Sequence, residues 1–190
     1  MTTTICLIRH GETDWNAQKR CQGRENIELN GNGKIQAAEI AEPLKKIDWD
    51  VIISSPLQRA ETTACIIGEV LKKNLITTND KFIERDYGKA SGLTFHQLKE
   101  TFPDELIPGK ESDEDLQQRV FEGLCEAVNT YENKNILLVS HGAVINSLLK
   151  KISKGAIDIG ETNIKNAHIN LIKHDGVTFR VDMYNSPDLL

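Results

Sequence analysis

Residues 4–12 read Thr-Ile-Cys-Leu-Ile-Arg-His-Gly-Glu, and residues 135–142 read Asn-Ile-Leu-Leu-Val-Ser-His-Gly. In both stretches an unbroken aliphatic run leads to a histidine and a glycine. Such a run between polar residues is typical of a strand buried on both faces, as in a parallel sheet. Ligands of open α/β sheets bind at the carboxyl ends of these strands. The pattern therefore predicts that His10 and His141 meet in one cleft, and the adjacent Arg9 indicates that the cleft handles an anion.

The rest of the chain alternates between strand-like and helix-like patterns. Ser55 is predicted to cap a helix with Pro56 at its first position, and Thr94 and Ser112 are predicted to cap two more. The expected strands are 4–8, 51–53, 75–78, 136–139, 167–173 and 177–184, and the expected helices cover about 37–44, 55–73, 94–102, 112–128 and 144–152. This order predicts an α/β fold with a mostly parallel sheet and an antiparallel element near the C-terminus.

Length and composition narrow the possible partners. The chain has 190 residues, for which one domain covering 1–190 is expected, and its 23 basic and 28 acidic residues give a net charge of −5. This balance argues against nucleic acid as a partner, because nucleic-acid binding needs a concentrated basic face. No apolar run approaches the roughly 20 residues of a membrane span, and no cationic leader is present, so a cytoplasmic location is expected. The oligomeric state is left open between monomer and homodimer.

Metal binding and redox chemistry have no signal in the sequence. The four cysteines are scattered without a Cys-x-x-Cys pair. The acidic residues Glu111, Asp113, Glu114 and Asp115 are expected to be a solvated helix start, where negative charge suits the helix dipole. No metal or other cofactor is therefore expected.

The stretch from Arg9 to Glu12 offers a nucleophile beside an anion-binding group. A neutral imidazole can attack phosphorus without a separate base, and arginine matches phosphate oxygens while keeping its charge. Gly11 is expected to let the backbone turn close to the ligand. On this stretch alone, an ion pair at the end of a strand remains an equal alternative.

The longer motif resembles a known family. Residues 9–16, Arg-His-Gly-Glu-Thr-Asp-Trp-Asn, match the Arg-His-Gly-x-Ser/Thr-x-x-Asn signature of the histidine phosphatase superfamily, the phosphoglycerate-mutase-like proteins. The blocks at 22–23, 54–64, 84–88 and 140–142 follow in the family's order. In type the chain is most similar to bacterial broad-specificity phosphatases. The resemblance implies a central sheet with helices on both faces and a short helical cap insertion at about 85–115 that sets substrate specificity.

The resemblance also implies roles for individual residues. His10 would attack the substrate phosphorus and carry a phosphohistidine intermediate, while Glu84 would protonate the leaving oxygen and then activate water. Arg9, Arg59 and His141 would surround the transferring group and stabilise its charge. The substrate would be a small phosphorylated metabolite. The residues implied in binding it are Asn16, Gln22, Gly23, Arg85, Tyr87 and Gly142.

Two questions stay open at this point. Glu84 adjoins Arg85, and a surface ion pair between them would lower the pKa of Glu84 rather than raise it. The sequence Glu84–Gly88 leans toward the mutase form, in which the arginine and tyrosine hold the substrate carboxylate. However, only 57 positions separate Glu84 from His141, without the arginine pair of the mutases. A phosphatase is therefore preferred, with phosphoglycerate mutase and a catalytically silent phospho-metabolite-binding module as alternatives.

Overall fold

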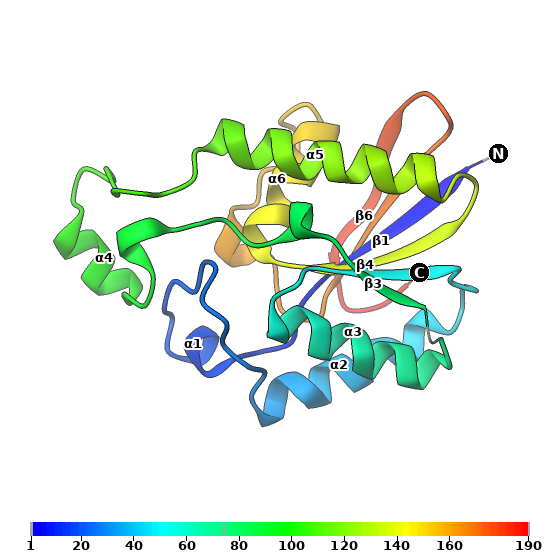
Figure 1. Ribbon diagram of the computed structural model, residues 1–190, viewed down its shortest axis with the longest axis horizontal. Helices are drawn as coiled ribbons and strands as arrows, with labels where there is room; N and C mark the ends of the chain where they lie inside the picture. Colours follow the sequence, from blue (N-terminus) through cyan, green and yellow to red (C-terminus); the bar gives the residue numbers. More distant parts are fainter. Residues whose placement is uncertain (1, 74, 190) are drawn as a thin grey trace.

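The computed structural model describes residues 2–73 and 75–189, which form an α/β structure around one central sheet (Figure 1). The strand order is β3-β2-β4-β1-β5-β6. β1 and β4 pair in parallel, as do β2 with β4 and β2 with β3, whereas β5 and β6 run antiparallel. The strands are β1 (Thr3–Arg9), β2 (Val51–Ser54), β3 (Ile76–Thr78), β4 (Asn135–Ser140), β5 (Ile169–His174) and β6 (Phe179–Ser186). The predicted mostly parallel sheet with a C-terminal antiparallel element is confirmed.

Helices cover both faces of the sheet, as the resemblance implied. α2 (Gly31–Leu44) and α3 (Gln58–Leu71) pack on one face, and α5 (Asp113–Thr130) and α6 (Gly142–Ile152) on the other (Figure 1). Side chains alternate along β1: Ile5 and Leu7 join the core with α5 and α6, and Cys6 and Ile8 join the core with α2 and α3. β1 is therefore buried on both faces, which places its carboxyl end inside the molecule.

Two of the three predicted helix starts are confirmed. Thr94 forms a capping box at the start of α4 (Phe95–Thr101), and the Ser112 hydroxyl caps α5. The prediction for Ser55 is wrong, because α3 begins at Gln58 after Leu57, which makes no side-chain cap. The buried Ser55 hydroxyl accepts the Leu57 amide at 3.3 Å and lies 2.7 Å from His141 Nε2.

Segment 85–115 extends beyond the carboxyl ends of β1 and β4 (Figure 1), and the start of α4 meets the loop that follows the short helix α1 (Asp14–Ala17), where the Phe95 amide donates to the Lys19 carbonyl at 3.1 Å. Backbone hydrogen bonds join it to the loop after β1: the Cys21 amide donates to the Leu93 carbonyl at 2.9 Å, and the Gly92 amide donates to the Cys21 carbonyl at 2.8 Å. The short 3₁₀ turns of the chain are η1 (Asp80–Phe82), η2 (Gly88–Ala90) and η3 (Glu161–Asn163). Among the described residues, no helix has the length and apolar character needed to span a bilayer.

Candidate active site

The two predicted histidines meet at the carboxyl ends of neighbouring parallel strands. Arg9 of β1 lies opposite Ser140 of β4, so His10 and His141 follow in register. Their ring centroids are 5.2 Å apart, and both side chains are buried. The structure thus brings together two histidines that are 131 positions apart in the sequence, as predicted.

His10 is held in one tautomer. Its Nδ1 lies 2.7 Å from the Gly11 carbonyl oxygen, and Arg59 Nε donates to its Nε2 at 3.2 Å. A guanidinium can only donate, so Nε2 must accept and Nδ1 must carry the proton. Burial, together with the charges of Arg59 and Arg9, lowers the pKa of His10 well below its ordinary value. His10 is therefore a neutral imidazole whose Nε2 lone pair faces Arg59.

Arg59 joins His10 to the loop that follows Gly23. It lies in the first turn of α3, where Nη1 donates to the Glu25 carbonyl at 2.7 Å and Nη2 to the Gly23 carbonyl at 2.8 Å. Burial lowers the pKa of Arg59 to about 10, so the side chain remains charged at neutral pH. A buried charge whose contacts are neutral acceptors lacks a counter-ion. Arg59 forms no ion pair among the described residues, although the charge of Glu84 acts on it, and it places a positive charge beside the His10 nitrogen.

Arg9 and His141 each leave one buried nitrogen open. Arg9 Nη1 donates to the Ile164 carbonyl, and His141 Nε2 lies 2.7 Å from the Ser55 hydroxyl. Arg9 Nε and His141 Nδ1 have no hydrogen-bond partner within residues 2–73 and 75–189. Burial and the charge of Arg59 lower the pKa of His141 well below its ordinary value, so His141 is neutral. Unpaired buried nitrogens are uncommon in folded proteins and indicate a site for a polar ligand.

Glu84 is a buried carboxyl group beside these cationic side chains. Only 8% of the residue is exposed, and its Oε1 accepts the Arg85 backbone amide at 2.8 Å. Burial raises the pKa of Glu84, and the charge of Glu161 adds to this increase. The hydrogen bond from the Arg85 backbone amide and the charges of Arg59 and Arg9 lower the pKa in part. The alternative of a surface ion pair is wrong, because the Arg85 side chain turns to Asp113 and Glu161.

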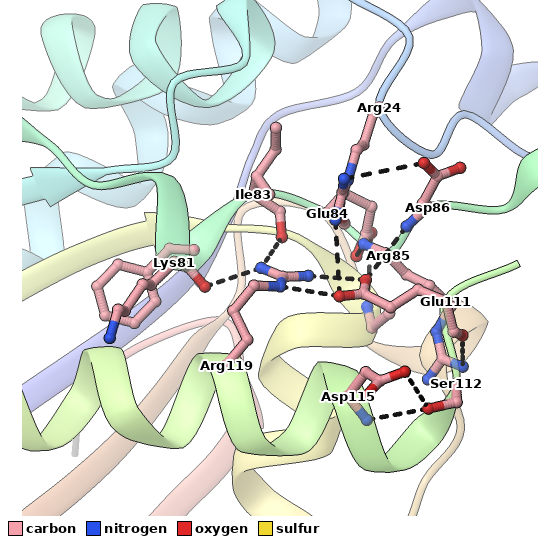
Figure 2. Close-up of polar contacts among 12 residues, drawn as sticks. Arg24, Lys81, Ile83, Glu84, Arg85, Asp86, Glu111, Ser112, Asp115 and Arg119 are labelled. Carbon is pink, nitrogen blue, oxygen red and sulfur yellow. Dashed lines mark hydrogen bonds and ion pairs between the residues drawn. The ribbon is translucent and has the colours of Figure 1, made fainter.

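The segment before Glu84 is held by an arginine that the motifs did not indicate. Arg119 of α5 donates through Nη1 to the carbonyl oxygens of Lys81 and Ile83, each at 2.8 Å (Figure 2). Its Nε and Nη2 grip both oxygens of Glu111 at 2.9 and 2.8 Å. This two-point pairing is the strong geometry for arginine and carboxylate. Arg119 thus ties the chain just before Glu84 to α5.

The acidic cluster at the start of α5 is only partly the solvated cap that was expected. Glu111 is largely buried against Arg119, and Asp113 accepts Arg85 Nη1 at 2.5 Å. The Glu111 amide also donates to the Asp86 carbonyl at 2.8 Å. Two of the four acidic residues therefore hold the loop that carries Glu84. The expectation failed because sequence alone does not show which cation a carboxylate will meet.

A small hollow, here called the His10 cavity, joins most of the predicted site. Its lining among the described residues includes the predicted Arg9, His10, Asn16, Gln22, Gly23, Arg59, Glu84, Tyr87 and Gly142, together with Arg20, Cys21, Phe95, Ala143, Glu161 and Thr162. Two predicted residues lie outside this lining: His141 is buried beside the His10 ring, and Arg85 faces other surface hollows with Asp113. Arg85, which was expected to bind the substrate with the residues of the His10 cavity, therefore lies outside the lining of this cavity.

Two glycines allow close backbone contacts at the site. A Cβ on Gly11 would lie 2.3 Å from the Gly33 carbonyl oxygen, so this position accommodates α2. A Cβ on Gly142 would lie 2.5 Å from the Glu161 carbonyl oxygen. The expectation that Gly11 serves a ligand is therefore replaced by a packing role, and Gly142 brings Glu161 close to the start of α6.

Three further residues at the site, Ser55, Glu161 and Asn166, were not predicted from the sequence motifs. Asn166 Nδ2 donates to the His10 carbonyl at 2.8 Å and so steadies the backbone at His10. Ser55 stands in the second family block, which was a usable signal. Glu161 lies in the short turn η3, for which neither pattern nor spacing gave an indication.

Known proteins are similar to this chain in sequence or in fold. The chain is 42% identical over 183 residues to the Bacillus subtilis protein named uncharacterized phosphatase PhoE, across 96% of this chain and 94% of that protein. The structure of Bacillus stearothermophilus YhfR matches with a TM-score of 0.87 at 26% identity, covering 99% and 98% of the two chains. Phosphoglycerate mutase from Bacillus anthracis, 21% identical, shares the fold with a TM-score of 0.88 over 98% of this chain and 94% of that one. The sequence profile of the histidine phosphatase superfamily (branch 1) matches residues 5–187, and the chain belongs to this family.

Proposed function

We propose that this protein is a phosphatase that hydrolyses small phosphomonoesters through a phosphohistidine intermediate on His10, without a metal ion. The observation that carries the proposal is the fixed tautomer of His10. Its Nδ1–H is bound to the Gly11 carbonyl, and its Nε2 lone pair is directed at Arg59. A nucleophile must have an unprotonated electron pair at the reacting atom, and here no separate base is needed to create one; the pair only has to be released from the Arg59 hydrogen bond.

In the first step, Nε2 of His10 attacks phosphorus and the bond from phosphorus to the ester oxygen breaks. Glu84 gives its proton to the departing oxygen, so the products are an alcohol, a phosphohistidine and a carboxylate. The raised pKa of Glu84 supports this role, because the group keeps the proton it must donate up to a higher pH than a free carboxyl group does. Arg59, Arg9 and His141 stabilise the charge on the phosphoryl oxygens, and the open Arg9 Nε and His141 Nδ1 are suitable donors.

In the second step, the Glu84 carboxylate takes a proton from water, whose oxygen attacks phosphorus. The bond from phosphorus to Nε2 breaks, which releases inorganic phosphate and restores neutral His10. The same carboxyl group thus alternates between acid and base. Its place in the His10 cavity allows both roles without another titrating residue.

Hydrolysis is favoured over the two alternatives by the surroundings of Arg85 and Glu84. A mutase must hold a phosphorylated acid in two orientations, but Arg85 is already paired with Asp113 and Glu161. A silent binding module would have no use for a buried acid with a raised pKa beside a nucleophile. Segment 85–115, with α4 and Phe95 at the His10 cavity, is proposed as the cap that contacts the alcohol portion.

The test supplies p-nitrophenyl phosphate and glycerol 3-phosphate and measures inorganic phosphate. We expect release from both, with a transient acid-labile phosphoryl label on the protein. A parallel reaction contains 3-phosphoglycerate and catalytic 2,3-bisphosphoglycerate. Isomerisation faster than phosphate release would favour the mutase alternative, and tight binding without turnover of any ester would favour the binding module.

A further inference from the structure

The wall of the His10 cavity beside Glu84 carries a second carboxylate. Glu161 lines the cavity, where its Oε1 accepts Arg85 Nη2 at 2.6 Å and its Oε2 accepts the Tyr87 hydroxyl. Burial, together with the nearby carboxylates of Glu84 and Glu161, raises the pKa of Tyr87 well above its ordinary value. The Tyr87 phenol is therefore neutral, and it donates its hydrogen bond to Glu161.

The two terminal nitrogens of Arg85 have little capacity left for a ligand, and its Nε, which has no hydrogen-bond partner within residues 2–73 and 75–189, is buried. Its Nη1 is paired with Asp113 at 2.5 Å, while its Nη2 is paired with Glu161. Two carboxylates thus balance one guanidinium. On this wall, a substrate would encounter the charged Glu161 beside the Glu84 carboxyl group, and Arg85, the cation that borders this wall, is already paired with two carboxylates.

The Glu161 carboxylate is fixed in place rather than a mobile surface group. The Glu161 carbonyl approaches Gly142 so closely that any Cβ there would clash. The side chain is only 28% exposed and is anchored from two sides by Arg85 and Tyr87. Moving it away would leave a largely buried arginine with one partner, which is costly.

We infer that Glu161 is a specificity-determining residue that selects phosphomonoesters whose alcohol portion carries no carboxylate near the ester. Glu161 occupies the two donors that a substrate carboxylate would use, and its own charge repels such a group. The inference rests on the proposed function and names its substrate class. One further cation at the cavity, Arg20, donates to the Gly92 carbonyl and the Gln18 amide oxygen, so its charge stays uncompensated. Binding of a substrate carboxylate by Arg20 would make selection independent of residue 161.

The test compares glycerol 3-phosphate with 3-phosphoglycerate. Both are esters of a primary alcohol, and they differ in a hydroxymethyl group against a carboxylate. The ratio of their kcat/KM values therefore cancels any effect of Glu161 on Glu84 that the two reactions share. Two unit charges about 6 Å apart at an effective dielectric constant of about 20 change an equilibrium by about a hundredfold. We expect the wild type to prefer glycerol 3-phosphate, and Glu161→Gln to shift the ratio toward 3-phosphoglycerate by about ten- to a hundredfold.

Asp113→Asn is the matched control. It removes the other carboxylate from Arg85 but does not line the His10 cavity, so the ratio should change much less. Glu161→Asp keeps the charge and should keep the preference. A wild-type preference for 3-phosphoglycerate would overturn the inference, even if Glu161→Gln did not fold. An unchanged ratio in folded Glu161→Gln, or an equal shift in Asp113→Asn, would also overturn it.

Calorimetric binding separates this inference from the proposed function. The two ligands are titrated into His10→Ala protein with Glu161 either present or replaced by glutamine. If no ester is turned over by the wild type, the proposed function fails, while the binding ratio still reports on selection at residue 161. If esters are hydrolysed but neither ratio responds to Glu161→Gln, only the specificity inference fails.

Discussion

The two sides of the His10 cavity are built in different ways. The phosphate side, comprising Arg9, His10, Arg59 and His141, stands on the ends of β1 and β4 and on the first turn of α3. The acid side carries Glu84 on an irregular segment after η1, outside any strand or helix. That segment is held by Arg119 and Glu111 of another part of the chain (Figure 2).

The residues on the two sides of the cavity are therefore positioned by different kinds of interaction. Backbone pairing between buried parallel strands places the nucleophile and its neighbouring histidine with few degrees of freedom. The acid depends instead on side-chain ion pairs, which can change one residue at a time without disturbing the sheet. We therefore expect substitutions on the phosphate side to abolish turnover, and substitutions on the acid side to change its dependence on leaving group and pH.

The largest effect is expected for His10→Ala. Without the Nε2 lone pair no phosphohistidine can form, so turnover should fall by at least about ten-thousand-fold. The measurement is single-turnover labelling with a radioactive phosphomonoester, followed by acid lability of the label. His96→Ala, an exposed substitution on α4, is the matched control and should keep full labelling. Normal labelling of folded His10→Ala would show that another residue is the nucleophile.

Next in size is Glu84→Gln, which tests the acid side directly. Formation of the phosphoenzyme from an alkyl phosphate should slow by about a hundred- to ten-thousand-fold, the usual cost of losing a general acid. The loss should be far smaller for p-nitrophenyl phosphate, because p-nitrophenolate departs without a proton. Rapid-quench kinetics of both substrates provide the comparison. Equal losses would restrict Glu84 to an electrostatic role.

The pH dependence of the same step gives a second readout. Burial raises the pKa of Glu84 above its ordinary value of 4.5, so the group keeps its proton at a higher pH than a free carboxyl. Phosphoenzyme formation from an alkyl phosphate should decline as pH rises through that raised pKa, because the acid is then lost. Glu84→Gln should lack this decline. If the decline with rising pH persists in Glu84→Gln, the titrating group is not Glu84.

A smaller effect is expected for Arg119→Lys, which tests how the acid is positioned. Lysine keeps the charge but cannot grip both Glu111 oxygens and both backbone carbonyls. Phosphoenzyme formation from alkyl phosphates should fall by about tenfold, less than for loss of the acid itself, and p-nitrophenyl phosphate should be less affected. Gln118→Ala, on the exposed side of α5, is the control. An equal loss for both substrates would reduce Arg119 to a structural role.

The smallest effect is expected from chelation. Within the described ranges 2–73 and 75–189, no three His, Cys, Asp or Glu side chains are grouped as metal ligands. The charge on the phosphoryl group is met by arginines, so excess EDTA should leave the rate of phosphate release unchanged. Lost activity that returns with magnesium or zinc would contradict the proposed metal-independent reaction.

Local sequence patterns predicted the phosphate side because they act over short distances. An aliphatic run followed by His-Gly indicates both a buried strand and the side chain at its end, and this held for His10 and His141. The caps at Thr94 and Ser112 also depend on neighbours within three residues, and both formed. Ser55 does not cap α3, which begins three residues later, and its hydroxyl contacts both the Leu57 amide and His141, 86 positions away.

The sequence by itself thus determined the sheet, the family motifs and the position of His10 at the end of β1. Only the tertiary structure decided how Glu84 is buried and which charges surround it. Arg119 reaches the Ile83 carbonyl across 36 positions, and Tyr87 reaches Glu161 across 74. An acidic or basic residue in a sequence is equally compatible with solvent and with a buried partner. Whether such a residue is solvated or paired depends on which segments the fold brings together, because a charge needs a partner of opposite charge only where it is removed from water.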